Sequence, residues 1–102
     1  MSTEIPNEKL DPGHIPGPQA GYGEILEFAH TYDGYAECGS SEACAEIANA
    51  KQPETLAELR TCLFYEARRY RHFGVDPQGA DLEYIRNLVA RIRKKVECGD
   101  VL

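Results

Sequence analysis

The sequence predicts an all-α fold, a small four-helix bundle in which the second helix is short. Apolar residues recur every three or four positions between Ile25 and Val96, which is the spacing of a buried helix face. Residues that cap or stop helices separate these stretches. No segment alternates apolar and polar residues as a half-buried strand would. Because 102 residues suffice for about one domain, we expect a single helical domain over 22–98.

The N-terminal stretch 1–21 has a different composition from the rest. It holds four of the six prolines and three of the nine glycines. Proline removes backbone donors and fixes φ, and glycine adds chain entropy, so neither helices nor strands are favoured. We therefore expect a disordered, flexible N-terminal tail over 1–21, and we assign 99–102 to the C-terminal end.

The first helix is predicted over 22–37. Gly34 weakens its last turn, and Gly39 offers a stop signal. Its apolar stripe is formed by Ile25, Phe28, Ala29, Tyr32, Tyr35 and Ala36.

The short second helix is expected to begin after Ser40 or Ser41, since serine is a favoured N-cap. It should end before Pro53, because the residue that precedes a proline avoids the helical region.

The third helix is predicted over 54–73. Thr55 and Glu58 have the spacing of a capping box, and Gly74 suits the position after the last turn. So broad an apolar arc predicts a central position in contact with several elements. The arc is formed by Leu56, Leu59, Leu63, Ala67 and Tyr70, widened by Cys62 and Phe73.

The fourth helix is predicted to open at Asp76, as N-cap, and Pro77, as first-turn residue. Arg93 and Glu97 have the i, i+4 spacing of an ion pair. The seam that packs on the third helix is formed by Leu82, Ile85, Val89, Ile92 and Val96.

Composition indicates a soluble, acidic, cytoplasmic protein. The first residues lack the basic and apolar regions of a secretory signal, and no run approaches the ~20 apolar residues of a membrane span. The four cysteines do not have zinc-site spacing, so we expect free thiols, with Cys44 and Cys62 as small buried residues. We find no catalytic motif and expect neither cofactor nor metal.

A candidate partner-binding face lies on the third helix. Its members share the side turned away from Leu59 and Leu63, and tyrosine and arginine are enriched at binding hot spots. The face is formed by Tyr65, Arg68, Arg69 and His72.

A weaker candidate is a phosphate-binding cluster on the fourth helix. Residues 59–102 hold nine basic against six acidic residues, whereas 1–58 hold two against eleven. Cations in the last turns of a helix also complement its dipole, so the cluster has a structural interpretation as well. Its members are Arg86, Arg91, Lys94 and Lys95.

Glu66 falls inside the apolar arc of the third helix. A desolvated carboxylate there would suit a general base working with a histidine such as His30. We expect instead that Glu66 reaches water at the edge of the arc or pairs with Arg69 at i+3.

These features lead to three hypotheses about function. The leading one is a non-enzymatic protein-interaction or regulatory module that binds another protein or self-associates. The first alternative is a nucleic-acid-associated protein that uses the basic second half, which the net charge of −6 disfavours. The second is a small enzyme that uses Glu66 with a histidine. No membrane partner is expected.

Overall fold

The computed structural model describes residues 12–99, which form five α-helices and one short 3₁₀-helix, η2 (Pro12–His14). Within that range there is no strand, and the predicted all-α fold is confirmed. The five helices are α1 (Tyr22–Ala29), α2 (Gly34–Cys38), α3 (Ser41–Ala50), α4 (Leu56–Phe73) and α5 (Ala80–Glu97).

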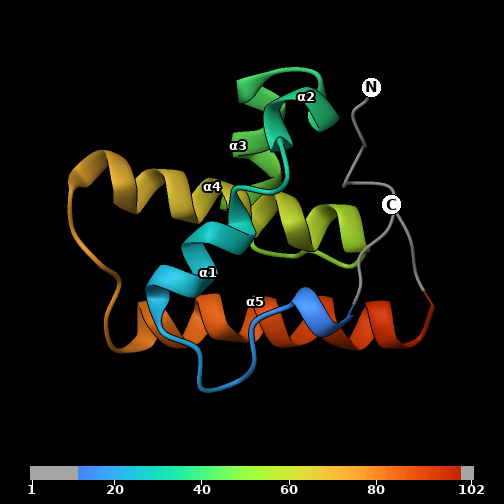
Figure 1. The fold of residues 1–102 in the computed structure, drawn as a ribbon. Coiled ribbons are helices and arrows are strands. Elements are labelled where there is room, and N and C mark those ends of the chain that lie inside the picture. The colour runs from blue at the N-terminus through green and yellow to red at the C-terminus, as the bar shows by residue number, and fades with distance from the viewer. Residues whose placement is uncertain (1–11, 100–102) are drawn as a thin grey trace, which may run out of the picture.

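Helix α4 has the central position that its broad apolar arc predicts. It packs against α1, α2, α3 and α5, and Figure 1 shows it between α5 on one side and α2 with α3 on the other. Ten of its eighteen residues are buried.

The first predicted helix, 22–37, is in fact two helices. Helix α1 ends at Ala29, and the hydroxyl of Thr31 donates to the carbonyl oxygen of Phe28 at 2.7 Å. Asp33 then caps α2, because its carboxylate accepts from the backbone N–H groups of Tyr35 and Ala36. The apolar spacing continues across the break, so periodicity alone does not reveal the three local side-chain hydrogen bonds that interrupt the helix.

The capping residues of α3 and α4 are those expected. Ser40 accepts from the N–H of Ala43 at 3.1 Å. Thr55 and Glu58 form the reciprocal capping box, with bonds of 3.1 and 3.2 Å. Gly74 ends α4 with a φ of +72°, a left-handed conformation that glycine adopts without strain.

Helix α5 begins later than predicted. Its N-cap is Gly79 rather than Asp76, and no side chain caps it. Gly79 has a φ of 60° and a ψ of −130°, a backbone conformation incompatible with a helix that continues from Pro77. The predicted pair of Arg93 and Glu97 is present at 3.7 Å.

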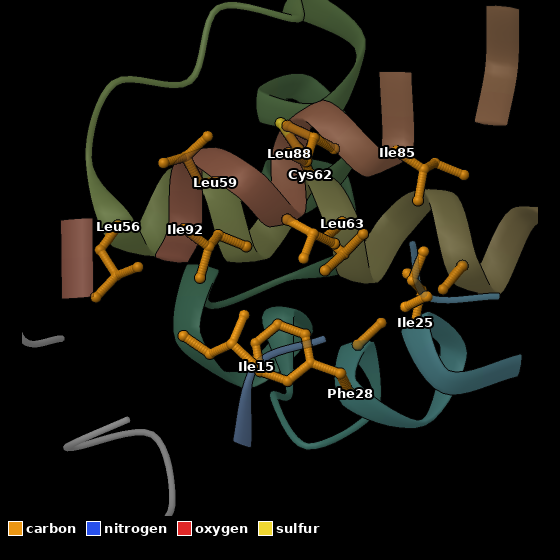
Figure 2. Packing of buried hydrophobic residues seen from close by; sticks show 14 of the residues in the cluster. Ile15, Ile25, Phe28, Leu56, Leu59, Cys62, Leu63, Ile85, Leu88 and Ile92 are labelled. Atoms are coloured by element: carbon orange, nitrogen blue, oxygen red, sulfur yellow. The ribbon is translucent and has the colours of Figure 1, made fainter. Parts of the chain in front are cut away.

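The main core lies where α1, α4 and α5 meet. Figure 2 shows Ile15 and Phe28 pointing into the same cluster as Leu63 and Ile92. The predicted seam of α5 is buried except for Leu82, which is half-buried. A smaller cluster, formed by Tyr32, Cys44 and Phe64, fills the space between α2, α3 and α4.

The packed chain begins before the boundary expected at Tyr22. Residues 1–11 and 100–102 lie outside the described residues, so most of the predicted tail and of the C-terminal end is not described. Residues 15–20, which we call the N-terminal strap, bury Ile15 and Ala20 at 4% and 8% exposure. Arg93 donates to the carbonyl oxygen of Ile15 at 2.6 Å, and Arg86 donates to that of Ala20 at 3.0 Å.

Cys44 and Cys62 are fully buried, as predicted, and burial raises the pKa of each thiol to about 11. All four cysteines are free.

Among residues 12–99, no helix combines the length and the apolar character needed to cross a bilayer.

Candidate functional site

The predicted partner face is only partly exposed. Arg68, Arg69 and His72 are exposed, but Tyr65 is half-buried against the small cluster. The guanidinium of Arg68 lies 5.1 Å from the ring centroid of Tyr35, a cation–π contact that ties it to the same cluster. Arg69 and His72 are therefore the exposed members of this face that do not contact the small cluster, and they lie toward the C-terminal end of α4.

Two large apolar side chains extend this accessible part. Phe73 is 64% exposed and Val75 is 56% exposed. The prediction that Phe73 widens the buried arc is wrong, because Phe73 is the last residue of α4 and the chain turns away at Gly74. The ring centroids of His72 and Phe73 are 5.4 Å apart, and the two rings meet edge to face. We call Arg69, His72, Phe73 and Val75 the Phe73 patch.

A pocket of about 660 Å³ adjoins the Phe73 patch between α1 and the end of α4. We call it the α1–α4 pocket. Val75 belongs to both the patch and the pocket wall, so the two form one continuous surface. The pocket is lined by Tyr22, Leu26, Glu27, His30, Tyr70, Arg71, Gly74, Val75 and Asp76.

Two polar atoms in the wall of this pocket have no hydrogen-bond partner. They are the hydroxyl of Tyr22 and Nε2 of His30, and both are buried. Burial lowers the pKa of His30, and the positive charges of Arg71 and Arg68 lower it further. Burial raises the pKa of Tyr22, with a smaller contribution from Asp76. Both side chains are therefore neutral near pH 7 and can form ordinary hydrogen bonds.

The predicted phosphate-binding residues do not form one site. Arg91, Lys94 and Lys95 line a hollow of about 330 Å³ together with Cys98. Arg86 lies apart, against the N-terminal strap. Arg91 also donates to the carbonyl oxygen of Pro53 at 2.7 Å, so part of its role is structural.

Glu66 does not reach water as expected, since only 4% of it is exposed. Its charge acts on three tyrosines, one each on α1, α4 and α5. Burial raises the pKa of Tyr22, Tyr70 and Tyr84, and the charge of Glu66 adds to each shift. Among the described residues, no hydrogen bond joins Glu66 to His30, whose charged neighbours are Arg71 and Arg68. The geometry therefore offers no support for a pair of Glu66 and His30 as acid and base.

No metal-binding cluster of three or more His, Cys, Asp or Glu side chains occurs within residues 12–99. Sequence reasoning located Arg69 and His72 but missed Phe73, Val75 and the pocket beside them. The signal that could have found Phe73 is its place next to Gly74, since a side chain in the last turn has no following turn to cover it.

The chain matches no family model, no curated protein and no solved structure. Its functional interpretation therefore depends on the geometry of these surfaces.

Proposed function

We propose that this protein is a non-enzymatic interaction module that binds a partner protein through the Phe73 patch and the α1–α4 pocket. The observation that carries the proposal is the exposure of Phe73 and Val75 beside a pocket. A single exposed apolar side chain is ordinary, but two next to a hollow are typical of binding sites. Docking would remove both side chains from water, which is favourable at about 25 cal/mol per Å² of apolar area.

The charges around the patch indicate the chemistry of the partner. Arg68, Arg69 and Arg71 are exposed at this end of α4, whereas Glu27 and Asp76 are the acidic residues of the pocket. Basic side chains therefore predominate on the patch side. A complementary partner presents an acidic segment with at least one large apolar side chain, since complementary charge favours encounter and fixes orientation.

The two unpartnered atoms of the pocket support the same interpretation. A buried polar atom without a hydrogen bond costs about 1–3 kcal/mol. A partner that supplied a polar group to Tyr22 or His30 would recover part of that cost. Both atoms are covered in the free protein, so the side chains would have to turn toward the partner, and rotamer changes are common when interfaces form.

A selection experiment tests the proposal and does not require the partner to be identified first. Random peptides displayed on phage are selected against the purified protein. Enriched peptides should carry a large apolar residue flanked by Asp or Glu. Their binding should be lost in the Phe73→Ser, Val75→Ser double variant and kept in a matched double variant on α3, Asn49→Ser with Ala50→Ser.

Two results would contradict the proposal. One is enrichment of peptides that bind the Phe73→Ser, Val75→Ser variant as well as the wild type. The other is a dimer in light scattering that this variant abolishes, which would assign the surface to a second copy of the chain. Replacing Arg69 and Arg71 with glutamate tests the role of charge, because the variant should no longer bind acidic peptides.

A further inference from the structure

A second pocket lies beneath the N-terminal strap, and none of the residues of the Phe73 patch lines it. Its volume is about 430 Å³, within the range of small-molecule sites, which is roughly 300–1,000 Å³. The strap provides Pro16 and Pro18, α1 provides Ile25, and α5 provides Val89 and Ala90. In Figure 1 the strap follows η2, which packs against α5, and then returns to the start of α1.

Arg86 and Arg93 bring positive charge to this apolar pocket. They are separated by about 10 Å along the axis of α5, since seven residues rise 1.5 Å each. Each guanidinium is held in place by one Nη2 bond to a strap carbonyl, at 3.0 Å for Arg86 and 2.6 Å for Arg93. The donors are therefore fixed before any ligand arrives.

The hydrogen-bonding capacity of both arginines is incompletely used. The Nε atom of each is buried and has no partner. Arg93 has a carboxylate neighbour in Glu97, but only at 3.7 Å, and none within 4.0 Å of Arg86 is found among the described residues. Charged donors that are removed from water without a partner are costly, and an anion is the group that satisfies them best.

One carboxylate, that of Glu83, also lines the pocket. It opposes one of the two positive charges there, and Glu97 outside the lining lies 3.7 Å from Arg93. Arg86 is therefore the guanidinium that lacks a carboxylate within 4.0 Å among the described residues. The carboxylate of a ligand would give Arg86 that partner. Asn87 adds an uncharged amide to the lining, which can donate to the same anion.

From these observations we propose that the strap pocket binds a small organic anion, a carboxylate carried on an apolar body. The carboxylate lies against the guanidinium of Arg86 or Arg93, and the hydrocarbon lies on Ile25, Val89 and Ala90. This site is independent of the Phe73 patch and of the function proposed for it.

A titration with hexanoate tests the proposal on the unmodified protein. The arginine Nε–Hε signals of Arg86 and Arg93, followed by NMR, should shift and saturate with a dissociation constant on the order of 1 mM. Hexanamide, which has the same shape but no charge, and inorganic phosphate, which has no apolar body, should shift them much less. If hexanoate gives no saturable shift, or hexanamide gives an equal one, the proposal is wrong.

A variant separates binding in the pocket from general attraction to cations. Ala90→Leu adds bulk to the lining of the pocket without replacing either arginine, and it should weaken hexanoate binding about tenfold or more. Lys94→Gln, which removes a charge outside this pocket, should leave binding within about twofold. Unchanged binding in a folded Ala90→Leu protein would also overturn the proposal.

Discussion

Gly34 occupies a position that a larger residue cannot fill without moving its neighbours. A Cβ atom there would lie 2.7 Å from Cδ2 of Phe64 and 3.4 Å from Sγ of Cys44. The ring of Phe64 is 4% exposed and meets the ring of Tyr35 edge-on, so it has little room to yield. The glycine thus allows the first turn of α2 to approach α4 closely.

We expect Gly34→Ala to lower the free energy of unfolding by about 1–2 kcal/mol, because overpacking outweighs the gain in helix propensity. Urea denaturation measures the change. Gly23→Ala is the matched control, since a Cβ there meets nothing within 4 Å, and it should be neutral or slightly stabilising. Equal effects of the two substitutions would show that Phe64 moves freely.

His30 makes stability depend on pH. Burial, and then Arg71 and Arg68, lower its pKa in the folded protein. The unfolded chain, with a histidine pKa of about 6.5, therefore binds a proton more readily than the folded chain. Stability is fully present above the unfolded pKa and falls as the pH decreases toward the folded value.

We expect the wild type to lose stability between pH 7 and pH 5, and His30→Gln to lose less over the same interval. Thermal unfolding across this interval gives the comparison, and an NMR titration of the ring reads the pKa directly. A midpoint at or above about 6.5 would contradict the assigned environment of His30.

Among the elements, the N-terminal strap departs furthest from expectation. Proline and glycine predict an irregular backbone there, and the strap is indeed irregular between η2 and α1. Irregular backbone is not the same as free backbone, however. Ile15 enters the main core. Arg86 donates to the carbonyl oxygen of Ala20, 66 positions away in the sequence, and Arg93 donates to that of Ile15, 78 positions away.

We expect Ile15→Ala to destabilise the protein by about 2 kcal/mol or more, the usual cost of truncating a buried isoleucine. Gln19→Ala, at an exposed position of the same strap, should change stability by less than about 0.5 kcal/mol. Equal stability of the two variants in urea would mean that the strap is not part of the folded unit.

At the scale of the whole molecule, charge bears on the nucleic-acid alternative. The chain carries −6 overall, and its basic residues on α5 are divided between the strap pocket and the hollow around Arg91, Lys94 and Lys95. Three neighbouring cations are few beside the phosphate contacts that usually hold a protein on a duplex. This distribution favours a protein partner at the Phe73 patch.

Should the alternative be right, a mobility-shift assay on duplex DNA will show binding at low salt that weakens steeply as salt is added. Exchange of Lys94 and Lys95 for glutamate would then abolish the shift. We expect no shift for the wild type at low salt. A salt-sensitive shift that depends on Lys94 and Lys95 would favour the nucleic-acid function instead.

The sequence by itself determined the all-α class, the caps of α3 and α4, and the buried seam of α5. These features depend on residues a few positions apart, such as Thr55 with Glu58, and on a periodicity that any core-facing helix must have. Arg69 and His72 could be placed on an outer face for the same reason.

Only the tertiary structure decided the rest. The anchoring of Ile15, the burial of Glu66 and the exposure of Phe73 depend on which distant segment covers each side chain. A wheel projection of α4 places Phe73 beside the buried residues, but Phe73 is 64% exposed and none of the elements within residues 12–99 covers it. Contacts between residues far apart in the sequence depend on how the helices pack, and the spacing of apolar residues along the chain does not predict them.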